Sequence, residues 1–215
     1  QVVFGEINKI QQIPKNQNAR GIINFGASEA ISNYLLSEPL NRVQRKLPNV
    51  HFNIYTATQS HLLDMISKGQ LDFGLFFYTP KLPGNLEISE EKPYRHHLVV
   101  KSDKQKNTAT LCRFLGSREI DDVETHKFPT LEYLRQHHPE AQIVFSSNSL
   151  SLHKQLVLKG QGVSVLPRFM IESELRRKSL VDIFPNKKFE WNLKLVQRKS
   201  ELIAPAGREF LTEVF

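Results

Sequence analysis

Two stretches of this chain repeat the same order of strand, polar turn, helix and strand, and that repeat limits the folds the chain can adopt. In the stretch 139–167, a run of β-forming residues at 142–145 precedes a polar turn, and apolar residues at helical spacing then continue to Gly160. A second strand, 163–166, ends at Pro167. Such a unit predicts parallel strands joined by a right-handed crossover.

The stretch 48–76 matches this unit without a gap. Lys68-Gly69-Gln70 aligns with Lys159-Gly160-Gln161, and Thr56, Ala57 and Thr58 align with Ser147, Asn148 and Ser149. One alternative is that α/β units share a generic pattern and align by chance. We favour a structural repeat, because internal similarity usually reports repeated architecture. The sequence therefore predicts two similar α/β lobes.

Hydroxyl-rich turns follow the strands in both lobes. Open α/β sheets bind small ligands at the carboxyl ends of their strands, beside helix N-termini, where free N–H groups favour anions. Ser28 follows a strand predicted over Gly21–Phe25; it could serve as an N-cap alone, or as a cap that also contacts an anion. Phe25, Phe76, Phe145 and Val165 could supply apolar walls. The candidate ligand-binding residues are Ala27, Ser28, Glu29, Thr56, Ala57, Thr58, Gln59, Ser147, Asn148, Ser149 and Val165.

The motifs Gly69-Gln70-Leu71-Asp72-Phe73-Gly74 and Gly160-Gln161-Gly162-Val163-Ser164-Val165-Leu166-Pro167 resemble those of LysR-type transcriptional regulators. The resemblance is to their effector-binding domain and runs from about Arg20 to the C-terminus. It implies the fold of type 2 periplasmic binding proteins, with two α/β lobes around a cleft and two crossover strands.

The resemblance also implies a domain plan and a set of partners. Residues 1–19 would be the end of a linker helix and a linker, 20–97 with 196–215 lobe I, and 98–195 lobe II. Leu98, Val99, Leu195 and Val196 would form the hinge. The N-terminal winged helix-turn-helix of intact members, their only DNA-binding part, is expected to be absent from this chain. We expect a homodimer of this domain, and a homotetramer of the full-length protein.

Composition favours a soluble intracellular protein. The chain has 215 residues, 40% of them hydrophobic, and a single cysteine, which indicates a reducing compartment. No apolar run reaches the roughly 20 residues of a membrane helix, so we expect a cytoplasmic protein without membrane contact. The net charge of +7 is scattered along the sequence and is not interleaved with aromatic residues, so solvated faces are favoured over direct DNA recognition.

Enzyme and metal motifs are missing from the sequence. It contains no GxSxG elbow, P-loop or GxGxxG, and the adjacent pairs His96-His97 and His137-His138 do not have chelating spacing. We therefore expect no catalysis, no cofactor and no metal site. The favoured function is a sensory domain of a transcription factor that binds a small effector, which we expect to be anionic. The alternatives are a solute-binding protein of a transport system and, with less support, an enzyme that uses the cleft.

Several local predictions can be compared with the structure. The patterns predict a helix over Val2–Ile13, a strand over Thr108–Leu115 that includes Cys112, and a long strand that starts at His96. Pro39 should kink or restart the helix that follows Ser28. A terminal helix should begin at Pro205.

Overall fold

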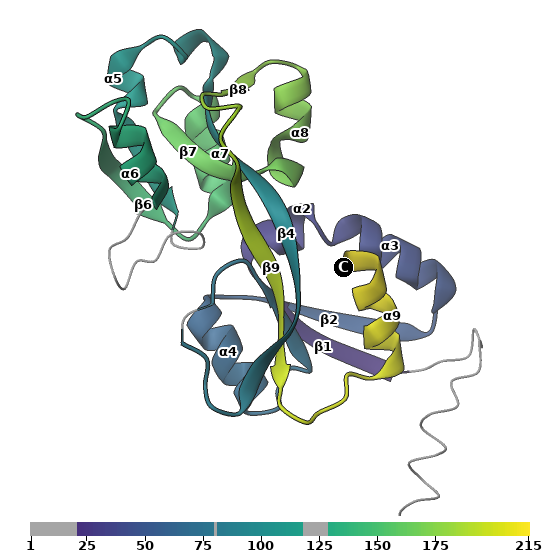
Figure 1. Cartoon of the computed structure of the whole chain (residues 1–215). Helices are drawn as coiled ribbons and strands as arrows, with labels where there is room; N and C mark the ends of the chain where they lie inside the picture. The colour runs from purple at the N-terminus through teal and green to yellow at the C-terminus, as the bar shows by residue number, and fades with distance from the viewer. Residues whose placement is uncertain (1–20, 80, 118–128) are drawn as a thin grey trace, which may run out of the picture.

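The structure is a computed structural model of the chain, and it describes residues 21–79, 81–117 and 129–215. Two α/β lobes are joined by two long strands that lie side by side, so the two-lobed fold predicted from the sequence is confirmed (Figure 1). The helix expected over Val2–Ile13 lies outside the described residues.

Lobe I is the lower body in Figure 1 and contains both β1 and the C-terminal helix. Its elements are β1 (Gly21–Ala27), α2 (Glu29–Tyr34), α3 (Ser37–Lys46), β2 (Val50–Thr56), α4 (Gln59–Ser67), β3 (Phe73–Phe76) and α9 (Pro205–Val214). Strand β1 pairs in parallel with both β2 and β3. The helix break expected at Pro39 is present, because α2 ends at Tyr34 and α3 has Pro39 buried in its first turn.

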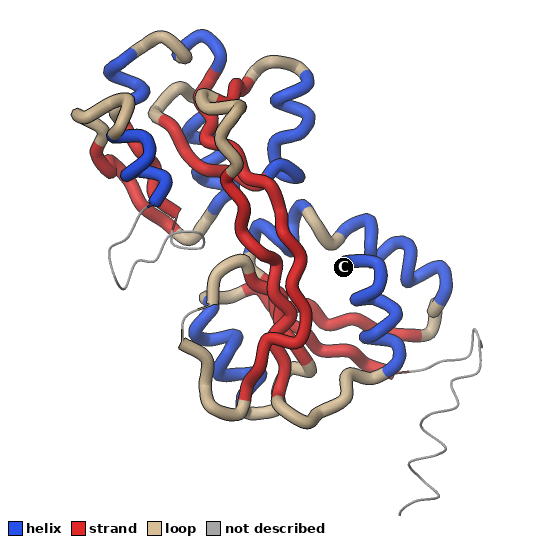
Figure 2. Tube along the Cα trace, in the orientation of Figure 1, coloured by secondary structure: helices blue, strands red, loops and turns tan. Residues whose placement is uncertain are grey.

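Lobe II is the upper body, and Figure 2 shows the same alternation of helices and strands. Its elements are η1 (Ser102–Lys104), α5 (Thr108–Leu111), β5 (Arg113–Ser117), α6 (Pro129–Arg135), β6 (Gln142–Ser147), α7 (Leu150–Leu158), β7 (Val163–Pro167), α8 (Arg168–Arg176) and β8 (Leu180–Asp182). Strand β5 pairs in parallel with both β6 and β7, so lobe II repeats the arrangement of lobe I.

The backbone confirms the repeat seen in the sequence. Helices α4 and α7 both end in a lysine followed by a glycine with positive φ, 75° at Gly69 and 73° at Gly160. This left-handed conformation is the usual end of a helix and favours glycine. Thr58 and Ser149 occupy the same N-cap position in the two copies, as the alignment predicted.

The two lobes share one sheet through antiparallel crossover strands, β4 (Leu86–Lys101) and β9 (Phe189–Arg198). The strand order is β2-β1-β3-β9-β4-β7-β5-β6, with β8 also paired to β4. Lobe II has its own buried cluster, centred on β5, β7 and α7, while lobe I has two, one of which contains the stacked rings of Phe25 and Phe73. Each lobe therefore has its own buried cluster, and Ala30 of α2 in lobe I also packs into the cluster of lobe II.

Two local predictions are wrong. Residues 108–111 form a short helix, not a strand, because the Asn107 side chain accepts a hydrogen bond from Thr110 N at 3.0 Å and caps the turn; Cys112 ends that helix and is partly exposed. Strand β4 begins at Leu86, ten residues before His96. Pro93 is tolerated there because the strand pairs with β9 alone at that point, so no donor is required on its free side.

Candidate functional site

In lobe I, the candidate residues collect at the carboxyl edge of β1 and β2. The register pairs Ala27 with Thr56, so the turns that follow the two strands lie side by side. Ser28 begins α2 with extended backbone angles, but its hydroxyl makes no capping hydrogen bond. Ser28 is 2% exposed, and Ser28 Oγ has no hydrogen-bond partner among the described residues. A buried hydroxyl without a partner costs free energy, so this atom is a candidate ligand contact.

A second candidate residue at this edge also has an unpartnered polar atom. Gln59, the first residue of α4, has a buried Nε2 with no acceptor in the described part of the chain. Thr58 precedes it as an exposed N-cap that makes no side-chain cap bond. Thr56 Oγ1 lies 3.0 Å from Ser32 Oγ, which ties the end of β2 to α2. The edge therefore offers a donor at Gln59 and free hydroxyls at Ser28 and Thr58.

In lobe II, the candidate turn uses most of its hydroxyls internally. Ser147 Oγ accepts a hydrogen bond from Ser149 N at 3.1 Å, and Ser149 Oγ accepts one from Leu152 N at 3.2 Å. Ser149 is thus the N-cap of α7, and its side chain makes the capping hydrogen bond. Asn148 between them is exposed and makes no hydrogen bond with the described residues.

Helix α2 of lobe I contacts the N-terminus of α7 in lobe II. Glu29 Oε2 accepts hydrogen bonds from Ser149 Oγ at 3.3 Å and from Ser151 N at 3.4 Å. Ser151 Oγ donates to Tyr34 Oη at 3.4 Å, and Lys154 Nζ lies 5.3 Å from the centre of the Tyr34 ring. A carboxylate at a helix N-terminus is favoured by the free N–H groups and the helix dipole. An acidic side chain of lobe I therefore occupies the anion-favouring end of a lobe II helix.

A buried histidine of α7, His153, lies near the Glu29 carboxylate. Ser164 Oγ donates to Leu115 O at 3.0 Å, so it accepts from His153 Nδ1, also at 3.0 Å. His153 Nε2 is then an acceptor, and it has no partner among the described residues. Burial lowers the pKa of His153 to about 4, an effect that the nearby Glu29 carboxylate partly offsets. The imidazole is therefore neutral at physiological pH.

Other candidate residues take positions in the cores. Ala27 and Val165 are buried at 0% and 2% exposure. Phe25 and Phe76 are fully buried in lobe I, so they pack the core and do not line a cavity wall as expected. The sequence reasoning did not single out Ser32, Tyr34 or Ser151 as polar contacts of the site. The available signal was the polar hydroxyl groups of Ser151, in the first turn of α7, and of Tyr34, at the end of α2.

The registers place the predicted hinge residues inside the lobes. Leu98 and Val99 pair with β7 in lobe II, whereas Leu195 and Val196 pair with β3 in lobe I. The part of the crossover that pairs with neither lobe is 92–95 of β4 opposite 190–193 of β9. The hinge role of the four named residues stays a prediction.

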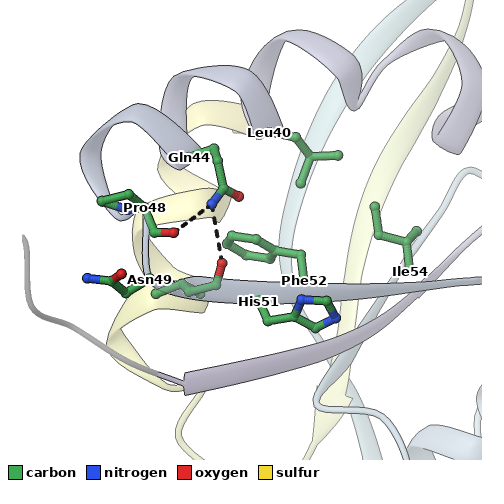
Figure 3. Close-up of a pocket in the computed structure, with 8 residues that line it drawn as sticks. Leu40, Gln44, Pro48, Asn49, His51, Phe52 and Ile54 are labelled. Atoms are coloured by element: carbon green, nitrogen blue, oxygen red, sulfur yellow. Dashed lines mark hydrogen bonds between the residues drawn. The ribbon is translucent and has the colours of Figure 1, made fainter.

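A groove of about 460 Å³ lies away from the contact between the lobes, on lobe I between α3 and β2. Figure 3 shows Leu40 of α3 and Phe52 of β2 beside it, with Gln44 Nε2 donating to Pro48 O at 3.1 Å and to Val50 O at 3.5 Å. The edge strand β2 and its neighbour also leave Ile22, Ile54 and Tyr55 exposed. The lining of the groove mixes apolar side chains with the polar Gln44, Asn49 and His51, and it contains none of the candidate ligand-binding residues.

The described residues contain no group of three or more His, Cys, Asp or Glu side chains placed to hold a metal ion. None of the helices in this part of the chain is both long and apolar enough to cross a membrane.

Two α/β lobes joined by two antiparallel crossover strands, with polar turns facing each other across the join, define a binding domain of the type 2 periplasmic-binding-protein class. The sequence profile of the LysR substrate binding domain matches residues 16–214. The chain belongs to this family, which consists of regulatory domains of transcription factors; they bind small effectors and oligomerise. The regulatory function is thereby supported over the transport alternative.

Solved structures share this fold at low sequence identity. The cofactor-binding domain of the Cbl transcriptional regulator has 16% identity and a TM-score of 0.73, over 95% of this chain and 92% of that one. A cysteine variant of the OxyR2 regulatory domain from Vibrio vulnificus has 19% identity and a TM-score of 0.67, over 95% and 96%. HinK, a LysR family regulator from Pseudomonas aeruginosa, has 18% identity and a TM-score of 0.67, over 99% and 74%. A search of curated proteins found no match.

Proposed function

We propose that this domain binds a small effector between its lobes and passes the change to the DNA-binding part of a transcription factor. The observation that carries the proposal is the pair of buried polar atoms without partners, Ser28 Oγ and Gln59 Nε2, at the carboxyl edge of lobe I. Buried polar groups in native proteins are nearly always hydrogen-bonded, so such atoms suit a missing ligand. We assign Thr58 and Ser149, the two N-caps, to the same site.

An anionic effector fits this arrangement. A carboxylate, phosphate or sulfate could accept hydrogen bonds from Ser28, from Gln59 and from the N-terminus of α7. Glu29 already supplies a carboxylate to α7, through Ser149 Oγ and Ser151 N. We infer that the effector's anion takes over these donors and displaces Glu29. A contact between the lobes is then exchanged for one through the ligand, and a ligand shifts an equilibrium only through such a difference between states.

We propose that the crossover strands convert this exchange of contacts into a movement of one lobe against the other. We propose that bending occurs at 92–95 and 190–193, where β4 and β9 pair only with each other. Fewer backbone hydrogen bonds hold this part than hold the strand segments inside the lobes. A rotation there would move the two lobes against each other, as in hinge closure around a ligand.

Self-association forms part of the proposal. The exposed Ile22, Ile54 and Tyr55 on lobe I and the exposed Ile143 and Phe145 on the other edge strand, β6, give two apolar sheet edges at opposite ends of the sheet. In a two-fold antiparallel pair, each edge of one copy would cover the other edge of its partner. We propose this homodimer for the domain and a homotetramer for the full-length protein, which acts in the cytoplasm and binds DNA through its N-terminal domain.

The proposal can be tested with a thermal-shift screen. The panel would contain small mono- and dicarboxylates, inorganic phosphate and inorganic sulfate; one similar structure, an OxyR2 variant, is described as sulfate-bound. A ligand at a concentration about a hundredfold above its Kd stabilises the folded state by about 2.7 kcal/mol, which gives a readily measured rise in Tm. A hit whose effect is lost in Gln59→Leu, but kept in Gln44→Leu of the α3–β2 groove, would support the site. A hit lost only in Gln44→Leu would place binding in the groove.

A further inference from the structure

The end of lobe II farthest from lobe I brings together basic residues that are spread over the sequence. Strand β4 leads to it at Lys101, which pairs with Leu180. Ser102 N donates to Ser179 O at 3.1 Å, and Ser102 Oγ donates to Lys178 O. Arg113 Nε donates to Gln161 O at 2.9 Å. The segments 101–106, 159–161 and 176–179, together with Arg113, therefore form one surface, which we call the lobe II tip.

The lobe II tip has a high density of positive charge. Its basic residues are Lys101, Lys104, Lys106, Arg113, Lys159, Arg176, Arg177 and Lys178. Its segments contain one carboxylate, Asp103, which lies 3.2 Å from Lys101 Nζ. The other seven cations form no ion pair with the residues that the structure describes, and all of them except Lys104 are exposed. These like charges lie on one surface, and the described residues do not neutralise them.

Favourable interaction with helix C-termini explains only part of this pattern. Lys159 and Arg176 to Lys178 follow α7 and α8, where the dipole favours cations. The helix ends of lobe I have cations too, but there Lys46, Lys68 and Arg198 are each paired with carboxylates. Lys104 and Lys106 do not follow an α-helix, and Arg113 follows only the single turn of α5. Among the described residues, the cations that follow α7 and α8 thus lack the carboxylate partners that Lys46, Lys68 and Arg198 have in lobe I.

We propose that the lobe II tip binds the phosphate backbone of duplex DNA without sequence preference. None of the tip segments contributes an exposed large apolar side chain. A membrane-surface site needs apolar residues that insert, single-stranded nucleic acid needs aromatic rings that stack, and a protein interface needs an apolar centre. Backbone phosphates need only accessible cations, because affinity comes from released counterions.

The test uses fluorescence anisotropy of the 215-residue chain with a labelled duplex of arbitrary sequence, at salt concentrations from about 50 to 200 mM. The tip variant is Lys159→Gln with Arg176→Gln and Arg177→Gln. The control variant is Arg45→Gln with Lys81→Gln and Lys199→Gln, three exposed cations of lobe I. Both variants lower the net charge by three, so a difference between them reports position and not total charge.

We expect affinity near 50 mM salt to fall at least about tenfold in the tip variant and less than about threefold in the control. Removing three phosphate contacts should also lower the slope of log K against log salt by up to about 2.7. Equal losses in both variants would overturn the proposal, since binding would then follow net charge. No binding of the unmodified chain to duplex, together with tip-dependent binding to polyglutamate or to anionic vesicles, would overturn it in favour of another partner.

Discussion

Ser28 allows the binding role of a residue to be separated from its structural role. In most helices, replacement of a serine N-cap by alanine costs about 1 kcal/mol, because a capping hydrogen bond is lost. Here that bond is not made, and the hydroxyl is buried without a partner. A buried unsatisfied hydroxyl costs about 1–3 kcal/mol, so its removal should be neutral or stabilising. We expect Ser28→Ala to keep its unfolding free energy or to gain up to about 1 kcal/mol.

The same substitution should weaken the binding of the effector. Loss of a hydrogen bond to a charged ligand costs about 1.5–3 kcal/mol, which is roughly ten- to a hundredfold in Kd. Calorimetry with the strongest ligand from the screen would give the affinity, and thermal unfolding would give the stability. A gain of 1 kcal/mol raises Tm by about 2–4 °C in a chain of this size.

Ser149→Ala provides the matched control, because Ser149 Oγ does accept a capping bond, from Leu152 N at 3.2 Å. That variant should lose about 1 kcal/mol of stability. A Ser28→Ala protein that melts several degrees lower and binds the ligand as before would refute the reasoning, since Ser28 would then be a cap and nothing more.

Four further results are expected. Glu29→Gln should bind an anionic ligand about three- to tenfold more tightly by calorimetry, because a weaker internal competitor is displaced; unchanged affinity would argue against displacement. Unfolding free energy should fall between pH 8 and pH 5, because the unfolded chain takes up a proton below about 6.5 and buried His153 does so only near 4; denaturation of His153→Gln should show a loss smaller by about 2 kcal/mol. Gly162→Ala should cost about 1–3 kcal/mol in denaturant unfolding, since its Cβ would meet Arg113 O, whereas Gly84→Ala meets nothing and should be tolerated. Ile54→Lys should shift the chain toward monomer in analytical ultracentrifugation, and an unchanged dimer would place the interface elsewhere.

The fold was predictable because its strongest signals are local. Apolar periodicity together with Gly69 and Gly160 located both repeats, and the positive φ at these glycines explains why the two copies could be aligned. The short helix at 108–111 was missed because a single cap, Asn107, decides it against a β-forming sequence. The start of β4 was missed because its first half is paired on one side only and lacks the apolar run of a buried strand.

The residues of the candidate site could be chosen from the sequence on each lobe separately. Ser28 and Gln59 follow strands, and that position alone marked them as candidates. The contact of Glu29 with Ser149 and Ser151 depends on how the two lobes lie against each other, which residue spacing does not determine. The segment 92–95, where β4 leaves lobe I before it enters lobe II, likewise follows from strand register and not from composition.

The most direct test of the central claim is a crystal structure of this domain with the strongest ligand from the screen. The account predicts that the ligand lies between the lobes, within hydrogen-bonding distance of Ser28 Oγ and the N-terminus of α7, with the Glu29 carboxylate moved away from Ser149. A ligand bound outside the join, for example in the groove between α3 and β2, with the Glu29 contact intact, would contradict it.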